Sequence, residues 1–350
     1  MVFLPVVRTL GIGVLFATAV ISGGCSRSDS TGSAAGKTPQ AAAKEIRIGY
    51  FANLTHSQAV LGMASGEFER AVAPAKLTSR VFNAGPSLIE ALFAGEVDIG
   101  FVGPGPVINA HAKTKGQAIR VIAGAAANGV VVVVRPDAGI EKFEDLKGKR
   151  IATPQLGNTQ DLSARHFLTT RLGQTDLDNV VPIANGEQLA LMARKQIDAA
   201  WAPEPWGTRL VEEAGGRVLL EEKTLWPMEE FGLTMIVSTP AFLANHRDVV
   251  GKVLAVSRSW TARLNADRLK YVPDLAAALA MLTGKRMPEE LLGAAIQRIK
   301  FTDEPLEVTL QTMAQWSYEL KFLKDQVDLQ GLIDTTLLRE LESPPAPAGQ

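Results

Sequence analysis

The chain has 350 residues, a formal net charge of −1 and 46% hydrophobic residues, which suits a globular protein large enough for two domains. The charge balance gives no reason to expect nucleic acid as a partner. The single cysteine, Cys25, excludes a disulfide framework, and the four histidines show no metal-binding spacing. We therefore expect neither a metal nor another cofactor.

Residues 1–24 are predicted to be an export signal. Arg8 precedes the apolar stretch Thr9–Ile21, which is too short for a permanent membrane span but suits a signal peptide. The sequence ISGGC at 21–25 resembles the end of a bacterial lipoprotein signal, in which the cysteine receives lipid, although Ser22 stands where Leu is commonest. Cys25 is therefore the expected lipidation site, with plain secretion as the alternative. The Ser/Gly/Ala-rich residues 25–44 are predicted to form a flexible tether to the membrane.

Three predicted strands open the folded part, and each ends in a turn that passes into a helix: Glu45–Phe51, Lys76–Phe82 and Val97–Val102. Asn53 or Thr55 is expected to cap the first helix, His56–Ser65. The turns Asn83–Ser87 and Gly103–Pro106 carry Gly and Pro at a helix start, where free N–H groups and the helix dipole suit a small anion. Neighbouring parallel strands end at one sheet edge, so both turns are expected at one crevice, although each also fits an ordinary strand-to-helix turn.

The middle of the chain repeats this pattern and indicates a second α/β domain. A strand at Ile119–Ala123 precedes the β-branched run Gly129–Arg135, which is typical of a strand buried on both faces. The turn Pro154–Asp161 is rich in amides and hydroxyls that can bind an oxyanion. Further strands alternate with helices, as in a parallel α/β layer, at Arg150–Thr153, Asn179–Ile183, Ala199–Ala202 and Arg217–Leu220.

Phe231–Ser238 is interpreted as the chain crossing back to the first domain. The amphipathic helices predicted after it should pack there: Asp248–Asp267, Asp274–Leu282, Pro288–Arg298 and Leu306–Phe322. The expected organisation is one lobe from 45–134 with 236–342, a second lobe from 135–235, and a disordered tail at 343–350.

Several motifs together resemble the substrate-binding proteins of bacterial ABC importers, in the group for nitrate, sulfonates and taurine. They are IRIGYFANLTHSQA (46–59), FNAGPSLIEALFAGEVDIGFVGPGP (82–106), TPQLGNTQD (153–161), DAAWAPEPWGTRLVEEAGGRVL (198–219) and GLTMIVSTPAFLANH (232–246). The resemblance implies a type II periplasmic-binding-protein fold. In this fold two α/β lobes are joined by two crossover segments, and the ligand lies in the cleft between them.

The resemblance also implies ligand-binding residues on the turns of both lobes. In the first lobe they are Asn53, Thr55, His56, Gly85, Pro86, Ser87, Gly103, Pro104 and Gly105, with Asn128 and Gly129 near the hinge. In the second lobe they are Gln155, Gly157, Asn158, Thr159, Gln160, Glu204 and Trp206. Ser87, Thr159 and backbone N–H groups are expected to hold a sulfonate-like head, and Trp206 its organic tail.

Each of these roles has a plainer alternative. Glu204 is expected to accept from an amine or hydroxyl of the ligand, or otherwise to be an acidic residue that favours a helix dipole. Trp206 is otherwise a core residue. Asn158 and Thr159 are otherwise helix caps.

The leading functional hypothesis is capture without catalysis, followed by delivery to a membrane permease and its ATPase. Alkanesulfonate or taurine is the first expected ligand, then nitrate or bicarbonate, then a thiamin-pyrimidine-type heterocycle. The protein is expected to be an exported, lipid-anchored monomer on the periplasmic face or cell surface. A lipoprotein that senses a ligand and signals to a partner is an alternative. An enzyme forming the thiamin pyrimidine on the same fold is disfavoured, because only His56 is suitably placed.

Overall fold

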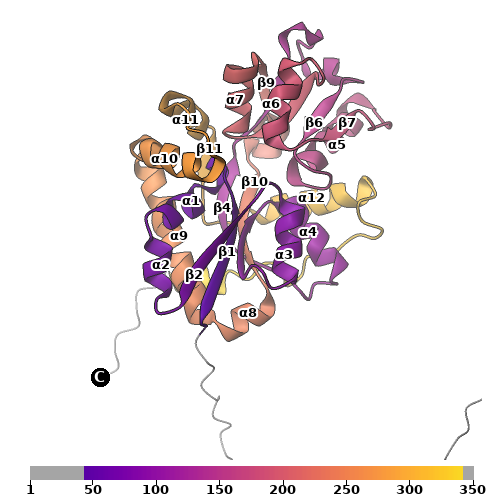
Figure 1. Cartoon of the computed structure of the whole chain (residues 1–350). Coiled ribbons are helices and arrows are strands. Elements are labelled where there is room, and N and C mark those ends of the chain that lie inside the picture. The colour runs from indigo at the N-terminus through magenta and orange to yellow at the C-terminus, as the bar shows by residue number, and fades with distance from the viewer. Residues whose placement is uncertain (1–42, 342–350) are drawn as a thin grey trace, which may run out of the picture. The chain divides into compact units, whose positions relative to one another are not determined.

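The computed structural model describes residues 43–341, so the predicted signal peptide, Cys25, nearly all of the tether and the tail lie outside the described residues. The described strands form two sheets (Figure 1). The six-stranded sheet has the order β11 (Ile299–Phe301), β4 (Arg120–Asn128), β10 (Gly232–Ser238), β3 (Ile99–Val102), β1 (Glu45–Phe51) and β2 (Lys76–Phe82). The five-stranded sheet has the order β7 (Val180–Pro182), β6 (Ile151–Thr153), β8 (Ala199–Pro203), β5 (Val130–Val134) and β9 (Arg217–Glu221).

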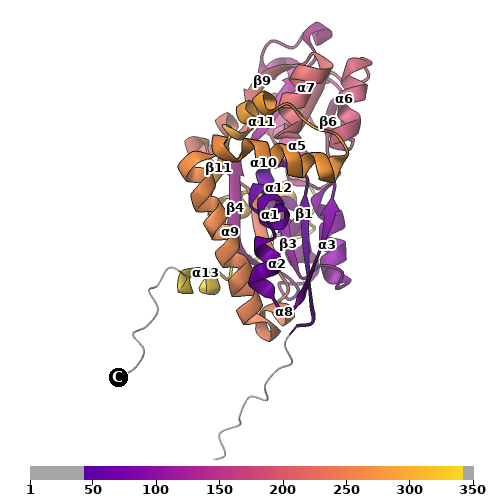
Figure 2. The same ribbon diagram turned by 60° about the vertical axis from the view of Figure 1, so that its left-hand side comes forward.

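Helices cover both sheets, and each sheet with its helices is called a lobe below. The helices of the first lobe, built on the six-stranded sheet, are α1 (Ser57–Ala64), α2 (Glu67–Val72), α3 (Gly85–Phe93), α4 (Pro104–Lys113), α8 (Pro240–Asn245), α9 (Arg247–Asp267), α10 (Val272–Thr283), α11 (Glu289–Ile296), α12 (Glu307–Glu319) and α13 (Thr336–Glu340). Those of the second lobe are α5 (Thr159–Leu172), α6 (Asn185–Ala193) and α7 (Trp206–Ala214). Helices α1, α2 and α9 pack on one face of the six-stranded sheet, and α3 and α4 on the other (Figure 2). Within residues 43–341, no helix combines the length and apolar character needed to span a bilayer.

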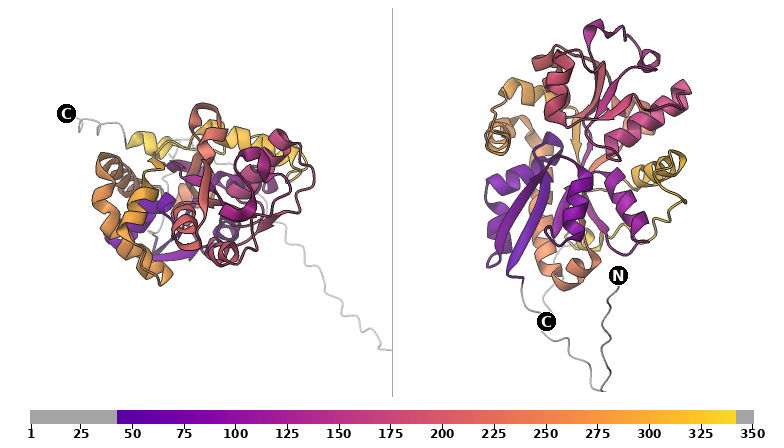
Figure 3. Two further views of the ribbon diagram at one scale, coloured as in Figure 1. Left: turned by 90° about the horizontal axis from the view of Figure 1, so that it is seen from above. Right: turned by 45° about the vertical axis from the view of Figure 1, so that its right-hand side comes forward.

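The chain changes sheet twice, as predicted. It leaves the first sheet between β4 and β5, where Asn128 and Gly129 both have positive φ (61° and 78°), and returns between β9 and β10. The Asn128 side chain joins the two crossovers, because its Oδ1 accepts from the Phe231 N–H at 3.2 Å and its Nδ2 donates to the Glu229 carbonyl at 3.4 Å. This places Asn128 and Gly129 at the hinge. Helix α12 packs beside both α4 and α5, so it also contacts both lobes (Figure 3).

Two sequence-based expectations about this region are wrong. The predicted boundaries place the valine run in the first lobe. In the structure this run is β5, which pairs with β8 and β9 of the second sheet. Strand β10 joins the first sheet from Gly232 onward. The lobe boundaries therefore lie at the crossovers rather than at 134/135 and 235/236. The second sheet is also mixed, since β5 runs antiparallel to both neighbours. All five valines are buried, and an apolar run does not specify strand direction or partner.

Other expected boundaries shift for local reasons. Neither Asn53 nor Thr55 caps a helix through its side chain, and a short 3-10 helix, η1 (Leu54–His56), precedes α1. The strand predicted at Ile119–Ala123 continues to Asn128 through a run of Ala and Gly that carries little strand signal. Gly124 is needed in this run, because a Cβ there would lie 2.1 Å from the Glu304 carbonyl oxygen. Small residues therefore let the chain at 302–304 approach β4 closely.

A buried carboxyl group lies where the return crossover begins. Glu222 is fully buried, and its two oxygens accept from the indole N–H groups of Trp201 (2.6 Å) and Trp226 (3.0 Å). Burial raises the pKa of Glu222 from its ordinary 4.5 to about 7, and the indole hydrogen bonds oppose this shift. Trp226 in turn stacks on Phe231 with ring centroids 5.1 Å apart. The crossover is thus packed around an acid that titrates near neutral pH.

Glu222 should make the protein less stable as the pH rises. Its folded pKa is higher than its unfolded pKa, so the unfolded state binds fewer protons between pH 4.5 and about 7. The stabilisation is complete below the unfolded pKa and is lost as the pH rises through the folded pKa. Glu222→Gln removes this titration. The test compares how the stability of each protein depends on pH, so the absolute stability of the variant does not matter. Urea unfolding of both proteins from pH 5 to pH 8 should show the wild type losing stability relative to the variant; parallel pH profiles would contradict this account.

Candidate functional site

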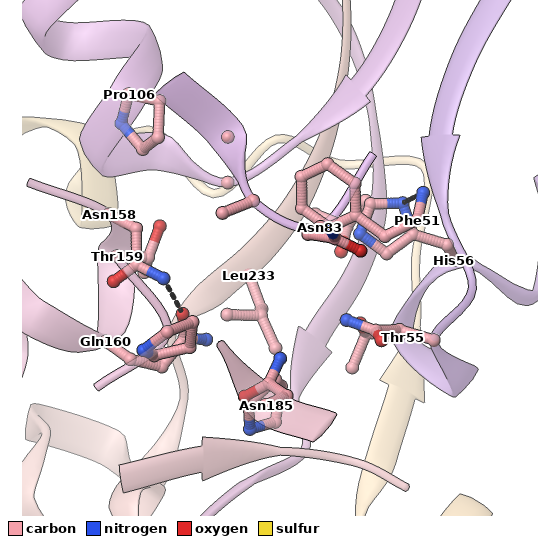
Figure 4. Close-up of a pocket in the computed structure, with 17 residues that line it drawn as sticks. Phe51, Thr55, His56, Asn83, Pro106, Asn158, Thr159, Gln160, Asn185 and Leu233 are labelled. Atoms are coloured by element: carbon pink, nitrogen blue, oxygen red, sulfur yellow. Dashed lines mark hydrogen bonds between the residues drawn. The ribbon is translucent and has the colours of Figure 1, made fainter. Parts of the chain in front are cut away.

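A cleft between the two lobes is lined mainly by the turns that follow their strands (Figure 4). The first lobe contributes Phe51, Asn53, Thr55, His56, Asn83, Ala84, Gly85, Gly103, Pro106, Leu233 and Thr234. The second lobe contributes Pro154, Asn158, Thr159, Gln160, Asn185 and Pro203. The cleft leaves about 30 Å³ for the centres of water-sized groups, which suits a bound group of a few heavy atoms.

Four helices begin at this cleft. Helices α3, α5 and α6 begin with the lining residues Gly85, Thr159 and Asn185, and α4 begins directly after the lining residue Gly103. A helix start carries unpaired N–H groups and the positive end of the helix dipole. Two of these helices come from each lobe, so the positive potential at the cleft is strongest when the lobes are together.

The lining residues carry no charge. None of those in the described structure is Asp, Glu, Lys or Arg, and His56 is their one titratable side chain. His56 is buried, and burial lowers its pKa to about 3, so the ring is neutral at physiological pH. Its Nδ1 lies 3.4 Å from the Phe51 backbone N–H and accepts from it, which assigns the ring proton to Nε2. His56 is therefore a neutral N–H donor at the cleft.

The amide side chains are also oriented so that donors remain. Asn53 Oδ1 accepts from the Trp206 indole N–H at 2.8 Å, which leaves the Asn53 amino group. Asn158 Oδ1 accepts from the Asp161 N–H at 2.8 Å. Asn158 Nδ2 donates to Gln160 Oε1 at 3.1 Å, which leaves the Gln160 amino group. The acceptor oxygens of Asn53, Asn158 and Gln160 are thus occupied, and the free amino groups of Asn53 and Gln160 suit an oxyanion.

Two lining side chains have an oxygen without a partner. Asn185 Oδ1 and Thr234 Oγ1 are buried and make no hydrogen bond within the described structure. An unpaired buried polar atom costs about 1–3 kcal/mol. The polar groups of the cleft are therefore incomplete without a bound molecule. Within residues 43–341, no group of His, Cys, Asp and Glu is arranged to hold a metal ion.

Eight of the predicted ligand-binding residues line the cleft: Asn53, Thr55, His56, Gly85, Gly103, Asn158, Thr159 and Gln160. Asn158 also caps α5, so its plainer alternative role holds as well. Gly105 lies at the contact between lobes, where its N–H donates to Thr159 Oγ1 at 3.3 Å.

Seven further predicted residues are not in the lining: Pro86, Ser87, Pro104, Asn128, Gly129, Gln155 and Gly157. Ser87 is exposed and lies in the first turn of α3, which already begins at Gly85. Asn128 and Gly129 belong to the hinge instead.

Glu204 and Trp206 also have roles other than the predicted contact with ligand. Glu204 is fully buried, accepts from the Thr208 N–H at 3.0 Å and pairs with Arg298 of the first lobe at 2.8 Å. Glu204 thus accepts from the first turn of α7 but precedes the N-cap residue Pro205, so it is not itself an acidic residue of the first helical turn. Trp206 lies on the Arg209 guanidinium, 4.6 Å from the ring centroid, and its N–H reaches Asn53. Its ring does not line the cleft.

Nine lining residues were not predicted: Phe51, Asn83, Ala84, Pro106, Pro154, Asn185, Pro203, Leu233 and Thr234. Asn83, Pro106 and Pro154 lie within the turns identified from sequence, so treating whole turns as the site would have found them. Asn185 lies in the turn between a predicted strand and the helix that follows it, so the same strand–turn–helix pattern would have found it. Thr234 lies inside the returning strand, where no local signal marks it.

Solved structures share this architecture. The alkanesulfonate-binding protein from Xanthomonas axonopodis pv. citri, bound to MOPS, superimposes with a TM-score of 0.69 at 22% identity, covering 84% of this chain and 99% of that one. The periplasmic nitrate-binding protein from Synechocystis gives a TM-score of 0.73 at 13% identity, covering 87% and 90%. The two-lobed periplasmic-binding-protein fold predicted from sequence is thereby confirmed.

Residues 39–280 match the NMT1-like family, and the chain belongs to this family. The taurine-binding periplasmic protein of Escherichia coli K12 is 29% identical over 209 residues, which is 59% of this chain and 63% of that protein. The chain spans about 64% of the length of the curated relatives that it matches first. These relatives are named as binding proteins rather than enzymes.

Gly103 offers a test of lobe closure. Its backbone (φ −78°, ψ 160°) suits any residue, but a Cβ there would lie 2.3 Å from Thr159 Oγ1 of the other lobe. Gly103→Ala should fold normally and hold the lobes apart, which small-angle X-ray scattering would show as a larger radius of gyration. Thr159→Ala in the same chain removes the clashing oxygen and should restore part of the closure. Scattering identical to the wild type in the single variant would contradict the assigned contact.

Proposed function

We propose that this protein is the solute-binding component of an ABC importer, which captures a small oxyanion between its lobes and delivers it to a membrane permease and its ATPase. The observation that carries the proposal is the uncharged cleft, where four helix starts and several amide and imidazole donors meet. The similarity to relatives that are named as periplasmic binding proteins supports it. The predicted export signal and the lipidation of Cys25 would keep a monomer at the membrane.

The proposed ligand is a short alkanesulfonate. A sulfonate head matches the neutral donors, and the apolar side chains of Phe51 and Leu233 suit a short alkyl tail. Taurine fits less well, because a carboxylate is the best partner for its ammonium group, none lines the described cleft, and Glu204 is already paired with Arg298. Nitrate is the second candidate. Bicarbonate is the third candidate: it carries a proton, and Asn185 Oδ1 is a lining amide oxygen without a partner in the described structure that can accept it.

A ligand panel tests this proposal. The chain without its predicted signal peptide is heated with ethanesulfonate, nitrate, taurine or bicarbonate. A ligand at 100 times its Kd stabilises the fold by about 2.7 kcal/mol, which corresponds to a shift of several degrees in Tm. We expect the largest shift with ethanesulfonate and a smaller one with taurine. No shift with any oxyanion would overturn the proposed ligand class and favour a sensor of a different molecule.

The affinity for ethanesulfonate should hardly depend on pH. The sulfonate stays ionised, and His56 stays neutral well above its pKa of about 3. Calorimetric titrations from pH 5 to pH 8 should therefore give a Kd constant within about twofold. Glu222→Gln serves as a control that removes a buried group whose pKa of about 7 falls in this range. Binding that strengthens steeply below about pH 6.5 would show instead that a protonated histidine holds the anion.

A further inference from the structure

We propose that Trp206 is a positioning residue of the cleft, whose indole N–H holds the Asn53 amide so that its amino group is offered to the bound oxyanion. This inference rests on the proposed function, because it assumes an anionic ligand. Trp206 lies outside the lining and acts through Asn53, which lines the cleft and is 6% exposed.

The bond between these residues spans the two lobes. Asn53 follows β1 of the first sheet, and Trp206 begins α7 after β8 of the second sheet. The indole Nε1 lies 2.8 Å from Asn53 Oδ1. An amide has one acceptor end and one donor end, so occupying the oxygen leaves two N–H donors. A second bond joins the same turns, since the Leu54 N–H donates to the Glu204 carbonyl at 3.2 Å.

The indole ring is itself held in place. One face lies on the Arg209 guanidinium at 4.6 Å, and Arg209 is fixed by two hydrogen bonds of 2.7 and 3.1 Å to Glu213. The ring edge faces Gly186, next to the lining residue Asn185: a Cβ on Gly186 would lie 3.7 Å from the ring. The second lobe therefore presents the indole N–H in a fixed direction.

Within residues 43–341, the Asn53 side chain makes no other hydrogen bond. It occupies the N-cap position of η1, where an Asn oxygen ordinarily accepts from the first helical turn, yet it makes no capping bond. Trp206 takes the place of that bond. Without the indole N–H, the amide is free to turn its oxygen toward the ligand and repel it. In a cleft without a charged side chain, the loss of one oriented donor is not compensated by a nearby cation.

Trp206→Phe deletes the N–H and retains an aromatic ring over Arg209. The matched control is Trp260→Phe, since Trp260 also lies on an arginine, Arg263, at 4.4 Å, but its indole N–H has no partner in the described structure. We expect the Kd for ethanesulfonate to rise about tenfold in Trp206→Phe and to stay unchanged in the control. The rise should come mainly from faster dissociation.

A double-mutant cycle separates positioning from general stability. In the Asn53→Ala background, Trp206→Phe should change the Kd no further, because its target is already absent. An equal loss in both backgrounds would overturn the proposal, and so would an unchanged Kd in the single variant. If the control weakens binding as much as Trp206→Phe, the effect belongs to any Trp→Phe change and the proposal fails.

A ligand-free measurement keeps the two proposals distinguishable. The indole N–H resonance of Trp206 should shift when Asn53 is replaced by Ala in the unliganded protein. If the resonance does not move, the bond is absent and the positioning role is overturned, whatever the ligand. If it moves but the wild type binds neither ethanesulfonate nor nitrate, the proposed function fails and the positioning role toward an oxyanion fails with it.

Discussion

The central physical constraint is that the cleft must hold its ligand without a charged side chain. Helix dipoles at the starts of α3, α4, α5 and α6 supply the positive potential, and unpaired N–H groups at the starts of α3, α5 and α6 add to it. The first turn of α4 adds none, because Pro104 and Pro106 have no N–H and the Gly105 N–H is bonded to Thr159. Neutral His56 and the oriented amides add donors. Such a site depends on geometry, because a dipole acts over a much shorter range than a full charge. This dependence explains why polar groups around the cleft form hydrogen bonds that hold its turns in place rather than facing solvent.

Closure and binding are therefore closely connected in this protein. Gly103 and Gly105 of the first lobe meet Thr159 of the second closely: a Cβ on Gly103 would lie 2.3 Å from Thr159 Oγ1, and one on Gly105 3.2 Å from the Thr159 nitrogen. On the other flank, Arg298 of the first lobe pairs with the buried Glu204 of the second, which fixes the turn that carries Trp206. Asn128 ties the two crossovers together at the hinge. The lobes can assemble the four helix starts only if these contacts form together.

The sequence predicted the architecture and the turns better than the individual contacts. Strand-turn-helix patterns located the turns after β2, β3 and β6, because Gly, Pro and Asn at helix starts are local signals. The partner of β5 could not be predicted, since five buried valines suit several sheet positions. The roles of Glu204 and Trp206 depend on Arg298 and Asn53, which are distant in sequence. The family resemblance implied contact with ligand for both side chains, whereas their observed partners are Arg298 and Asn53.

The most direct test of the account is a crystal structure of the protein with bound ethanesulfonate. We expect the sulfonate oxygens at the starts of α3 and α5, within hydrogen-bond distance of the Gln160 amino group and the His56 Nε2. We also expect no Lys or Arg side chain within about 4 Å of the sulfonate, the usual limit for an ion pair. A sulfonate bound against an arginine or lysine, or bound outside this cleft, would contradict the claim that neutral donors and helix starts hold the anion.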